Sequence, residues 1–242
     1  MLAPENSLGK LGLQPFNIFM LERVLILTCK VYENILLSDA LRLHNVNIVG
    51  TAHEVATAEN MVRNLNPDVI IIDIDYKHLN YIEFARTQRK VRGHLGFVFL
   101  ISTPDLRLLG ITESAIPYGS QILLRDTIAD IAIVRDAIHR SHEKAATGRE
   151  YEWFGSHSRE IHKAMASSLD ELTDAQMETL RLITEGKSNS EIGRIRYVTE
   201  KSVEQMVSRI AQQLGVFAAK HENLRVLITR EYFDLLSAPK YR

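Results

Sequence analysis

The chain has 242 residues, of which 45% are hydrophobic and 24% charged, and its formal net charge is −1. This composition is typical of a soluble globular protein with one large domain or two ordinary ones, and the charge neither favours nor excludes nucleic acid. No apolar run approaches the roughly 20 residues of a membrane helix, and the N-terminus lacks the pattern of a signal peptide, so we expect a cytoplasmic protein without a membrane partner. The single cysteine, Cys29, excludes an internal disulfide and a cysteine-based metal cluster.

The first long segment alternates short apolar runs with helical periodicity. Residues 1–21 have no clear period and are interpreted as an N-terminal extension, whereas residues 22–140 carry the alternation. Strands are expected at 24–27, 47–51, 69–74, 97–101 and 122–124, and helices near 33–44, 54–65, 80–91, 105–115 and 127–141. Strands that are apolar throughout and separated by helices predict an α/β flavodoxin-like, doubly wound domain. The helix at 105–115 has the weakest pattern, because it contains or adjoins Pro104, Gly110 and Pro117.

The last third of the chain has only helical periodicity. Residues 141–170, rich in polar side chains, predict a linker, and residues 171–242 predict a second, all-α domain. Thr173 and Gln176 have the spacing of a capping box, and Ser188 with Glu191 repeats this spacing at a second helix start. A third helix is expected after Thr199, which would cap it.

The third helix has one apolar and one polar face. Val203, Val207, Ile210 and Leu214 recur at helical spacing and form an apolar stripe. Lys201, Gln205, Ser208 and Gln212 fall on the opposite side, with Arg209 on its flank, and such side chains can contact base edges or phosphates. Periodicity alone also fits an ordinary amphipathic helix with a solvated face.

Residues 172–216 resemble, without a gap, the helix-turn-helix signature of the LuxR/NarL family. The resemblance rests on Leu172, Thr173, Glu178, Leu180, Leu182, Gly186, Ser188, Asn189, Glu191, Ile192, Thr199, Glu200, Lys201, Val203, Val207, Ser208, Ile210, Leu214, Gly215 and Val216. It implies a four-helix helix-turn-helix domain, with 199–213 as the recognition helix in the major groove and a final helix near 223–236 that forms a dimer contact. The DNA-binding residues expected on this basis are Ser188, Asn189, Arg194, Arg196, Thr199, Lys201, Ser202, Gln205, Ser208 and Arg209.

Two departures from that signature bear on DNA binding. Glu204 stands where the family commonly has Lys, and a carboxylate near phosphates would weaken non-specific affinity. Arg196 stands where an apolar residue is usual. Arg194 and Arg196 are interpreted either as compensating contacts to the DNA backbone or as solvated side chains.

The α/β segment resembles the receiver domain of response regulators, and the order of receiver, linker and helix-turn-helix resembles the NarL/FixJ class. Residues 67–85 align with the third strand and following loop of that family, which places Asp73 at the phospho-acceptor position. Ser102 matches the Ser/Thr at the end of the fourth strand, and Arg125 replaces the usual Lys after the fifth.

The acidic pair that binds Mg²⁺ in this family is missing. Phosphoryl transfer to an aspartate needs Mg²⁺ held by several oxygen ligands, but the first strand is followed here by Thr28, Cys29 and Lys30. We therefore expect no metal and no cofactor, and a vestigial Asp73 paired with Lys30 or Arg125. Asp75 would point to the other face if its strand continues, and toward the pocket only if the chain has already turned.

Other chemistry has little support in the sequence. Cys29 is interpreted either as a redox sensor, whose pKa Lys30 lowers, or as a packed side chain. No GxGxxG, P-loop, GxSxG or HExxH motif is present, so we expect that the protein is not an enzyme.

We therefore predict a pseudo-receiver joined to a sequence-specific DNA-binding domain, acting on promoter or operator DNA as a homodimer and without phosphorylation. The last strand and helix of the receiver-like segment, residues 122–140, are the preferred dimer contact, because Ile131, Val134 and Ile138 form an apolar stripe there; packing of this stripe on the sheet is the alternative. One rival function is a phosphorylation-responsive regulator with a degenerate pocket. Another is a module that binds a small ligand or a partner protein at the receiver-like domain, or whose helix-turn-helix contacts a partner protein.

Overall fold

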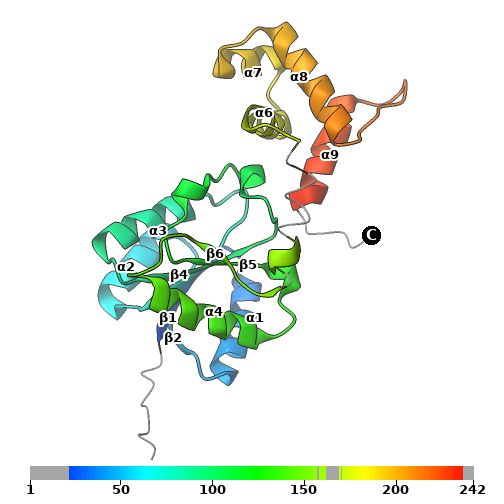
Figure 1. Cartoon of the computed structure of the whole chain (residues 1–242). Coiled ribbons are helices and arrows are strands. Elements are labelled where there is room, and N and C mark those ends of the chain that lie inside the picture. The colour runs from blue at the N-terminus through cyan, green and yellow to red at the C-terminus, as the bar shows by residue number, and fades with distance from the viewer. Residues whose placement is uncertain (1–21, 157, 162–168, 170, 237–242) are drawn as a thin grey trace, which may run out of the picture.

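The computed structural model describes residues 22–156, 158–161, 169 and 171–236, and Figure 1 shows an α/β domain followed by a helical domain. The expected N-terminal extension, residues 1–21, lies outside the described residues. No helix in the described part of the chain is long and apolar enough to cross a membrane.

A parallel sheet of six strands forms the centre of the α/β domain. Its strands lie in the order β2-β1-β3-β4-β5-β6. Their bounds are Arg23–Leu27 for β1, Asn47–Ala52 for β2, Val69–Asp73 for β3, Gly96–Ile101 for β4, Gln121–Leu124 for β5 and Glu152–Trp153 for β6. The five expected strands and the doubly wound fold are thus confirmed. Because β1 lies between β2 and β3, the strand order reverses there, and a crevice is expected beyond the carboxyl ends of β1 and β3.

Helices cover both faces of this sheet. Their bounds are Val31–Leu43 for α1, Val55–Leu65 for α2, Asn80–Val91 for α3 and Ile131–Lys144 for α4. Buried side chains of α1 and α4 pack against one face, and those of α2 and α3 against the other. All residues of β3 and β4 are buried, which is why these strands read as unbroken apolar runs.

The expected helix at 105–115 is replaced by two short 3₁₀ turns, η1 (Leu106–Leu109) and η2 (Glu113–Ala115). Gly110 ends η1 with a φ of 74°, a left-handed conformation that stops a right-handed helix. The prediction of one helix was therefore wrong, and the residues that weakened its pattern are the physical reason.

The α/β domain also extends past the expected boundary at residue 140. Helix α4 continues to Lys144, and β6, inside the expected linker, pairs with β5 in parallel. After α4 the chain returns to the edge of the sheet, where Gly148 packs closely on Gly119. A Cβ on Gly148 would lie 2.6 Å from the Gly119 Cα. A strand of two residues has no readable period, so the sequence pattern could not reveal it.

The apolar stripe on α4 faces inward. Val134 and Ile138 are buried against the sheet, and Ile131 packs at the edge of the same core cluster. The preference for this stripe as a dimer contact is thus corrected, because its apolar surface is used within the protomer.

Four helices make up the C-terminal domain: α6 (Asp174–Thr184), α7 (Asn189–Arg196), α8 (Glu200–Gln213) and α9 (Leu224–Leu236). The capping box of Thr173 and Gln176 is present, and Ser188 and Thr199 accept backbone N–H bonds at the starts of α7 and α8. The expected helix starts are therefore confirmed. These caps are readable from the sequence because each one joins residues only three positions apart.

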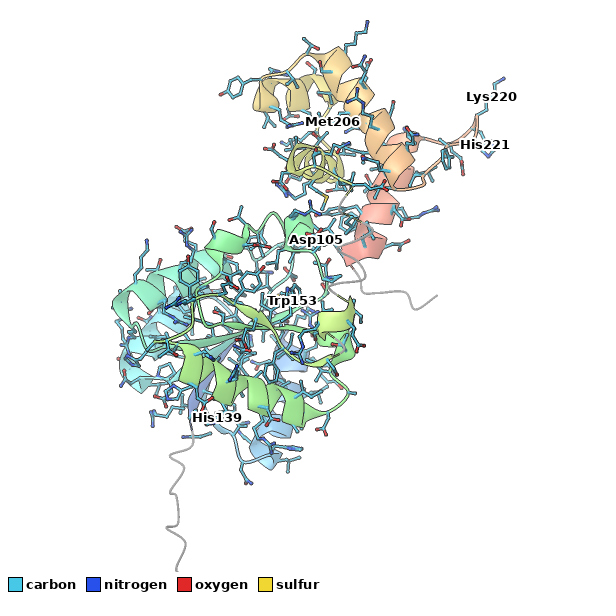
Figure 2. All side chains as sticks on the ribbon, viewed as in Figure 1. Asp105, His139, Trp153, Met206, Lys220 and His221 are labelled. Atoms are coloured by element: carbon cyan, nitrogen blue, oxygen red, sulfur yellow. The ribbon has the colours of Figure 1, made fainter. Side chains whose placement is uncertain are left out.

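The helical domain contacts the α/β domain through η1. Arg107 donates to the carbonyl oxygens of Leu169 and Leu172 at 3.1 and 2.9 Å, and Arg181 of α6 donates to the Arg107 carbonyl at 2.6 Å. Tyr232 of α9 donates to the Leu108 carbonyl at 2.7 Å. Figure 2 shows the labelled Asp105 on the side of the α/β domain that faces α6. This interface uses α6 and α9 and leaves the outer face of α8 free.

Candidate DNA interface and the pocket at Asp73

A tight turn joins α7 to α8. Tyr197 takes a left-handed conformation, with a φ of 55°, and Val198 donates its N–H to the Gly193 carbonyl at 2.9 Å. Gly193 is buried under this turn, where an added Cβ would lie 2.8 Å from the Val198 carbonyl oxygen. This packing sets how closely the turn approaches α7, and it therefore helps to place α8.

Helix α8 buries one face and exposes the other, as its sequence pattern predicts. Val203 and Ile210 are fully buried and Val207 nearly so. Lys201, Gln205, Ser208 and Arg209 are exposed. The Ser208 hydroxyl donates to the Glu204 carbonyl at 3.1 Å, so one polar group of this face is already used within the helix. The remaining long side chains present donors that suit base edges or phosphates.

Four of the other candidate residues are engaged in holding the domain together. The side chains of Ser188 and Thr199 cap their helices, and the hydroxyls of Thr199 and Ser202 lie 2.8 Å apart. The side-chain oxygen of Asn189 accepts a bond from Arg225 at 2.6 Å. Arg225 was missed by the sequence reasoning. It links the start of α9 to the start of α7 and also donates to the Lys187 carbonyl.

The two candidate arginines of α7 lie in different environments. Arg194 is exposed. Arg196 turns toward α6, where it donates to Glu178 at 3.1 Å and to the Thr179 hydroxyl at 2.5 Å, and its side chain is only 12% exposed. Arg196 therefore ties α7 to α6, and Arg194 is the one better placed to reach a phosphate.

The carboxylate at the phospho-acceptor position is buried and paired. Asp73 is 5% exposed, and Arg125 donates to one of its oxygens. The other oxygen accepts the Thr28 hydroxyl at 3.0 Å and lies 3.9 Å from the Lys30 ammonium. The predicted ion pair is thus confirmed with both cations.

This pocket does not fit Mg²⁺. An octahedral ion needs several oxygen ligands, but the Asp73 carboxylate already faces two cations and a hydroxyl donor. Strand β3 ends at Asp73 and the chain turns, so Asp75 does not point to the opposite face. It lies instead beside Cys29, with its oxygens 3.5 Å from the Cys29 Sγ and 2.8 Å from the His78 Nδ1.

The thiol of Cys29 is not activated by its surroundings. Burial raises its pKa, and the carboxylate of Asp75 raises it further, which outweighs the opposite effect of Lys30. A reactive cysteine needs a lowered pKa. The raised pKa thus does not support the interpretation of Cys29 as a redox sensor activated by Lys30.

The first domain is flavodoxin-like and has an ion pair at the phospho-acceptor position. The second is a helix-turn-helix domain whose helix α8 exposes polar side chains. Together they define a two-domain DNA-binding regulator. Residues 170–220 match the family described as bacterial regulatory proteins, luxR family. The activator EvgA of Escherichia coli is 24% identical over 177 residues, which cover 71% of this chain and 80% of EvgA. The response regulator VraR of Staphylococcus epidermidis is 27% identical over 173 residues, which cover 71% of this chain and 79% of VraR.

Solved structures with the same fold include RcsB from Salmonella enterica serovar Typhimurium bound to a promoter. It has a TM-score of 0.52 and 17% identity, and the match covers 88% of this chain and 98% of that one. A structure of two RcsB dimers on parallel DNAs has a TM-score of 0.54 with the same identity. Residues 170–220 therefore carry a LuxR-type DNA-binding domain, and the chain as a whole is similar to response regulators of the NarL/FixJ type.

Proposed function

We propose that this protein binds promoter DNA sequence-specifically as a homodimer, and that its binding does not depend on phosphorylation. The observation that carries the DNA-binding part is the exposed face of α8, which none of the described contacts between the two domains covers. Transcription would then be controlled by which promoters this face selects.

Each candidate on this face has a role set by its place along α8. Lys201 and Gln205 lie one turn apart in the first half of the helix, which is the part that enters the major groove in this motif. Arg209 lies one turn later on α8, and Arg194 lies on α7. Both side chains are suited to contact phosphates of the DNA backbone. Ser188, Asn189, Thr199 and Ser202 would add short contacts from the two helix starts, in part through backbone N–H groups.

The proposed independence from phosphorylation rests on Asp73. We expect that acetyl phosphate or beryllofluoride with Mg²⁺ leaves the affinity for a duplex unchanged, because Arg125 and Lys30 take the place of the metal. The measurement is a duplex titration of wild type and Asp73→Ala, each with and without the phosphodonor. A response regulator with an intact acidic pair, treated in parallel, shows that the phosphodonor is active. A several-fold gain in affinity that Asp73→Ala abolishes would contradict the proposal.

The proposed homodimer is supported by the outer face of α1. Val31, Tyr32, Ile35 and Leu36 are between 53% and 73% exposed, although they are large and apolar. Such a patch on a soluble domain is typical of a protein contact. We expect the full chain to sediment as a dimer at micromolar concentration and Ile35→Glu to shift it toward monomer. Asn64→Glu, at an exposed position on α2, is the control for the added negative charge. If Ile35→Glu and wild type sediment alike, the dimer does not use this face.

A second candidate function is binding of a partner protein by the helix-turn-helix. Tyr197, at the tip of the turn, is 96% exposed, and Glu204 adds a carboxylate to the outer face of α8. Both features suit a protein contact as well as DNA. Binding to a duplex that weakens steeply with salt favours DNA, since it reports the release of counterions from phosphates.

A further inference from the structure

A cluster of three possible metal ligands lies beside the Asp73 pocket. Cys29 follows β1, and Asp75 and His78 follow β3, the neighbouring parallel strand, so all three lie at the same edge of the sheet. The Cys29 Sγ is 3.5 Å from one oxygen of Asp75, and the His78 Nδ1 is 2.8 Å from the other. One ligand atom from each residue lies within 4.8 Å of the other two.

We propose that Cys29, Asp75 and His78 bind a divalent transition-metal ion of the zinc class. Zinc bonds of about 2.0 to 2.3 Å at tetrahedral angles put ligand atoms roughly 3.4 to 3.6 Å apart. The Cys29 sulfur is already at that separation from Asp75 Oδ2, and the His78 Nδ1 lies 2.8 Å from the other oxygen, Oδ1. With one ligand atom from each residue within 4.8 Å of the other two, small side-chain rotations bring the three to the separations that zinc requires. Three protein ligands leave the fourth position open for water or another ligand.

The kinds of ligand decide the class of ion. A thiolate and an imidazole suit zinc and its neighbours among the transition metals, whereas Mg²⁺ prefers oxygen ligands only. The site therefore differs from a phosphorylation pocket in both its residues and its ion. One cysteine is enough for such a site when histidine and aspartate complete the set of ligands.

Neighbouring groups hold the side chains of Asp75 and His78 in place. The Lys77 N–H donates to Asp75 at 2.8 Å. The His78 ring packs on Tyr81, with ring centroids 5.4 Å apart, and the Tyr81 hydroxyl donates to the His53 carbonyl at 2.8 Å. Such outer contacts orient metal ligands and tune their affinity. The side chains of Asp75 and His78 are 23% and 33% exposed, so an ion can reach them from solvent.

The ammonium of Lys30 places a positive charge close to the cluster. Lys30 adjoins Cys29, and its ammonium lies 3.3 Å from Glu33 and 3.9 Å from Asp73. Two carboxylates therefore share this cation, which reduces its repulsion of a bound ion. The ligand set itself carries two negative charges once the thiol has lost its proton, which matches a divalent ion.

Cobalt provides a direct test, because a thiolate bound to Co²⁺ gives a charge-transfer absorption in the near ultraviolet. We expect the full-length chain, without a histidine tag, to show this band with one Co²⁺ per chain, and Zn²⁺ to displace it. Cys29→Ser should remove the band, and His78→Gln should weaken binding at least about tenfold, as the loss of a first ligand exceeds the usual effect of an outer contact. His94→Gln, at an exposed histidine outside the cluster, is the matched control.

A second measurement needs no variant. Because Cys29 is the only cysteine, alkylation of the wild-type chain reports this site alone, and Zn²⁺ should slow it. The proposal is overturned if the wild type shows no thiolate band, if the band persists in Cys29→Ser, or if Zn²⁺ leaves the alkylation rate unchanged. It is also overturned if a folded His78→Gln binds as tightly as His94→Gln. No DNA is present in either experiment, so failure here is separate from failure of the proposed function.

Discussion

Ile210→Ala is expected to lower the free energy of unfolding of the helical domain by about 2 to 5 kcal/mol. Ile210 is fully buried in α8, and its side chain packs in the same cluster as Leu180 of α6 and Ile228 of α9. Removing it leaves a cavity at the point where three helices meet. A small domain has only a few kcal/mol of stability to lose, so this one change should leave much of the recognition helix unfolded.

Thermal unfolding followed by circular dichroism measures this effect. Gln212→Ala lies two residues along the same helix at an exposed position and is the matched control for helix propensity. Trp153, the only tryptophan, lies in β6, so its fluorescence reports the α/β domain and should change less. Equal melting curves for Ile210→Ala and Gln212→Ala would mean that α8 does not carry the core of the domain.

Much of the fold could be predicted because its signals are local. Strands such as β3 and β4 are buried on both faces, and a run of apolar residues is the direct result. The strand β6 could not be predicted, since it is held by pairing with β5 and not by a pattern of its own. The stripe on α4 was visible, but sequence periodicity cannot tell whether an apolar stripe packs on a sheet or on a second chain.

The residues of the candidate sites also divide into those that a local sequence pattern predicts and those that it does not. The helix caps join residues three apart and were predicted correctly, whereas Arg196 bonds Glu178 across a separation of eighteen residues that no local pattern reveals. Asp75 faces Cys29 because β3 ends two residues earlier, and the exact end of a strand is poorly encoded in its sequence. The pairing of Asp73 was predictable from the resemblance to receiver domains, because Lys30 follows β1 and Arg125 stands where that family has a Lys after its fifth strand.

The recognition helix gives the second large expected effect. Gln205→Ala is expected to cost about 1 to 3 kcal/mol of binding to a cognate duplex and to relax the preference at one base pair, because it removes a side chain that reads a base edge. Arg209→Ala should weaken cognate and scrambled duplexes alike and reduce the salt slope by about one unit, as expected for a lost phosphate contact. Lys201→Ala should show some of each effect.

Glu204→Lys is expected to act in the opposite direction. The carboxylate is exposed on the same helix, between Lys201 and Ser208, so a positive charge there should strengthen non-specific binding. Titrating the four variants against cognate and scrambled duplexes at two salt concentrations separates base contacts from phosphate contacts. Lys90→Ala, at an exposed position on α3 in the other domain, is the control for loss of one positive charge. If all four variants remain folded and bind as Lys90→Ala does, α8 does not read DNA, and the exposed Tyr197 and Glu204 then favour a partner protein at this face.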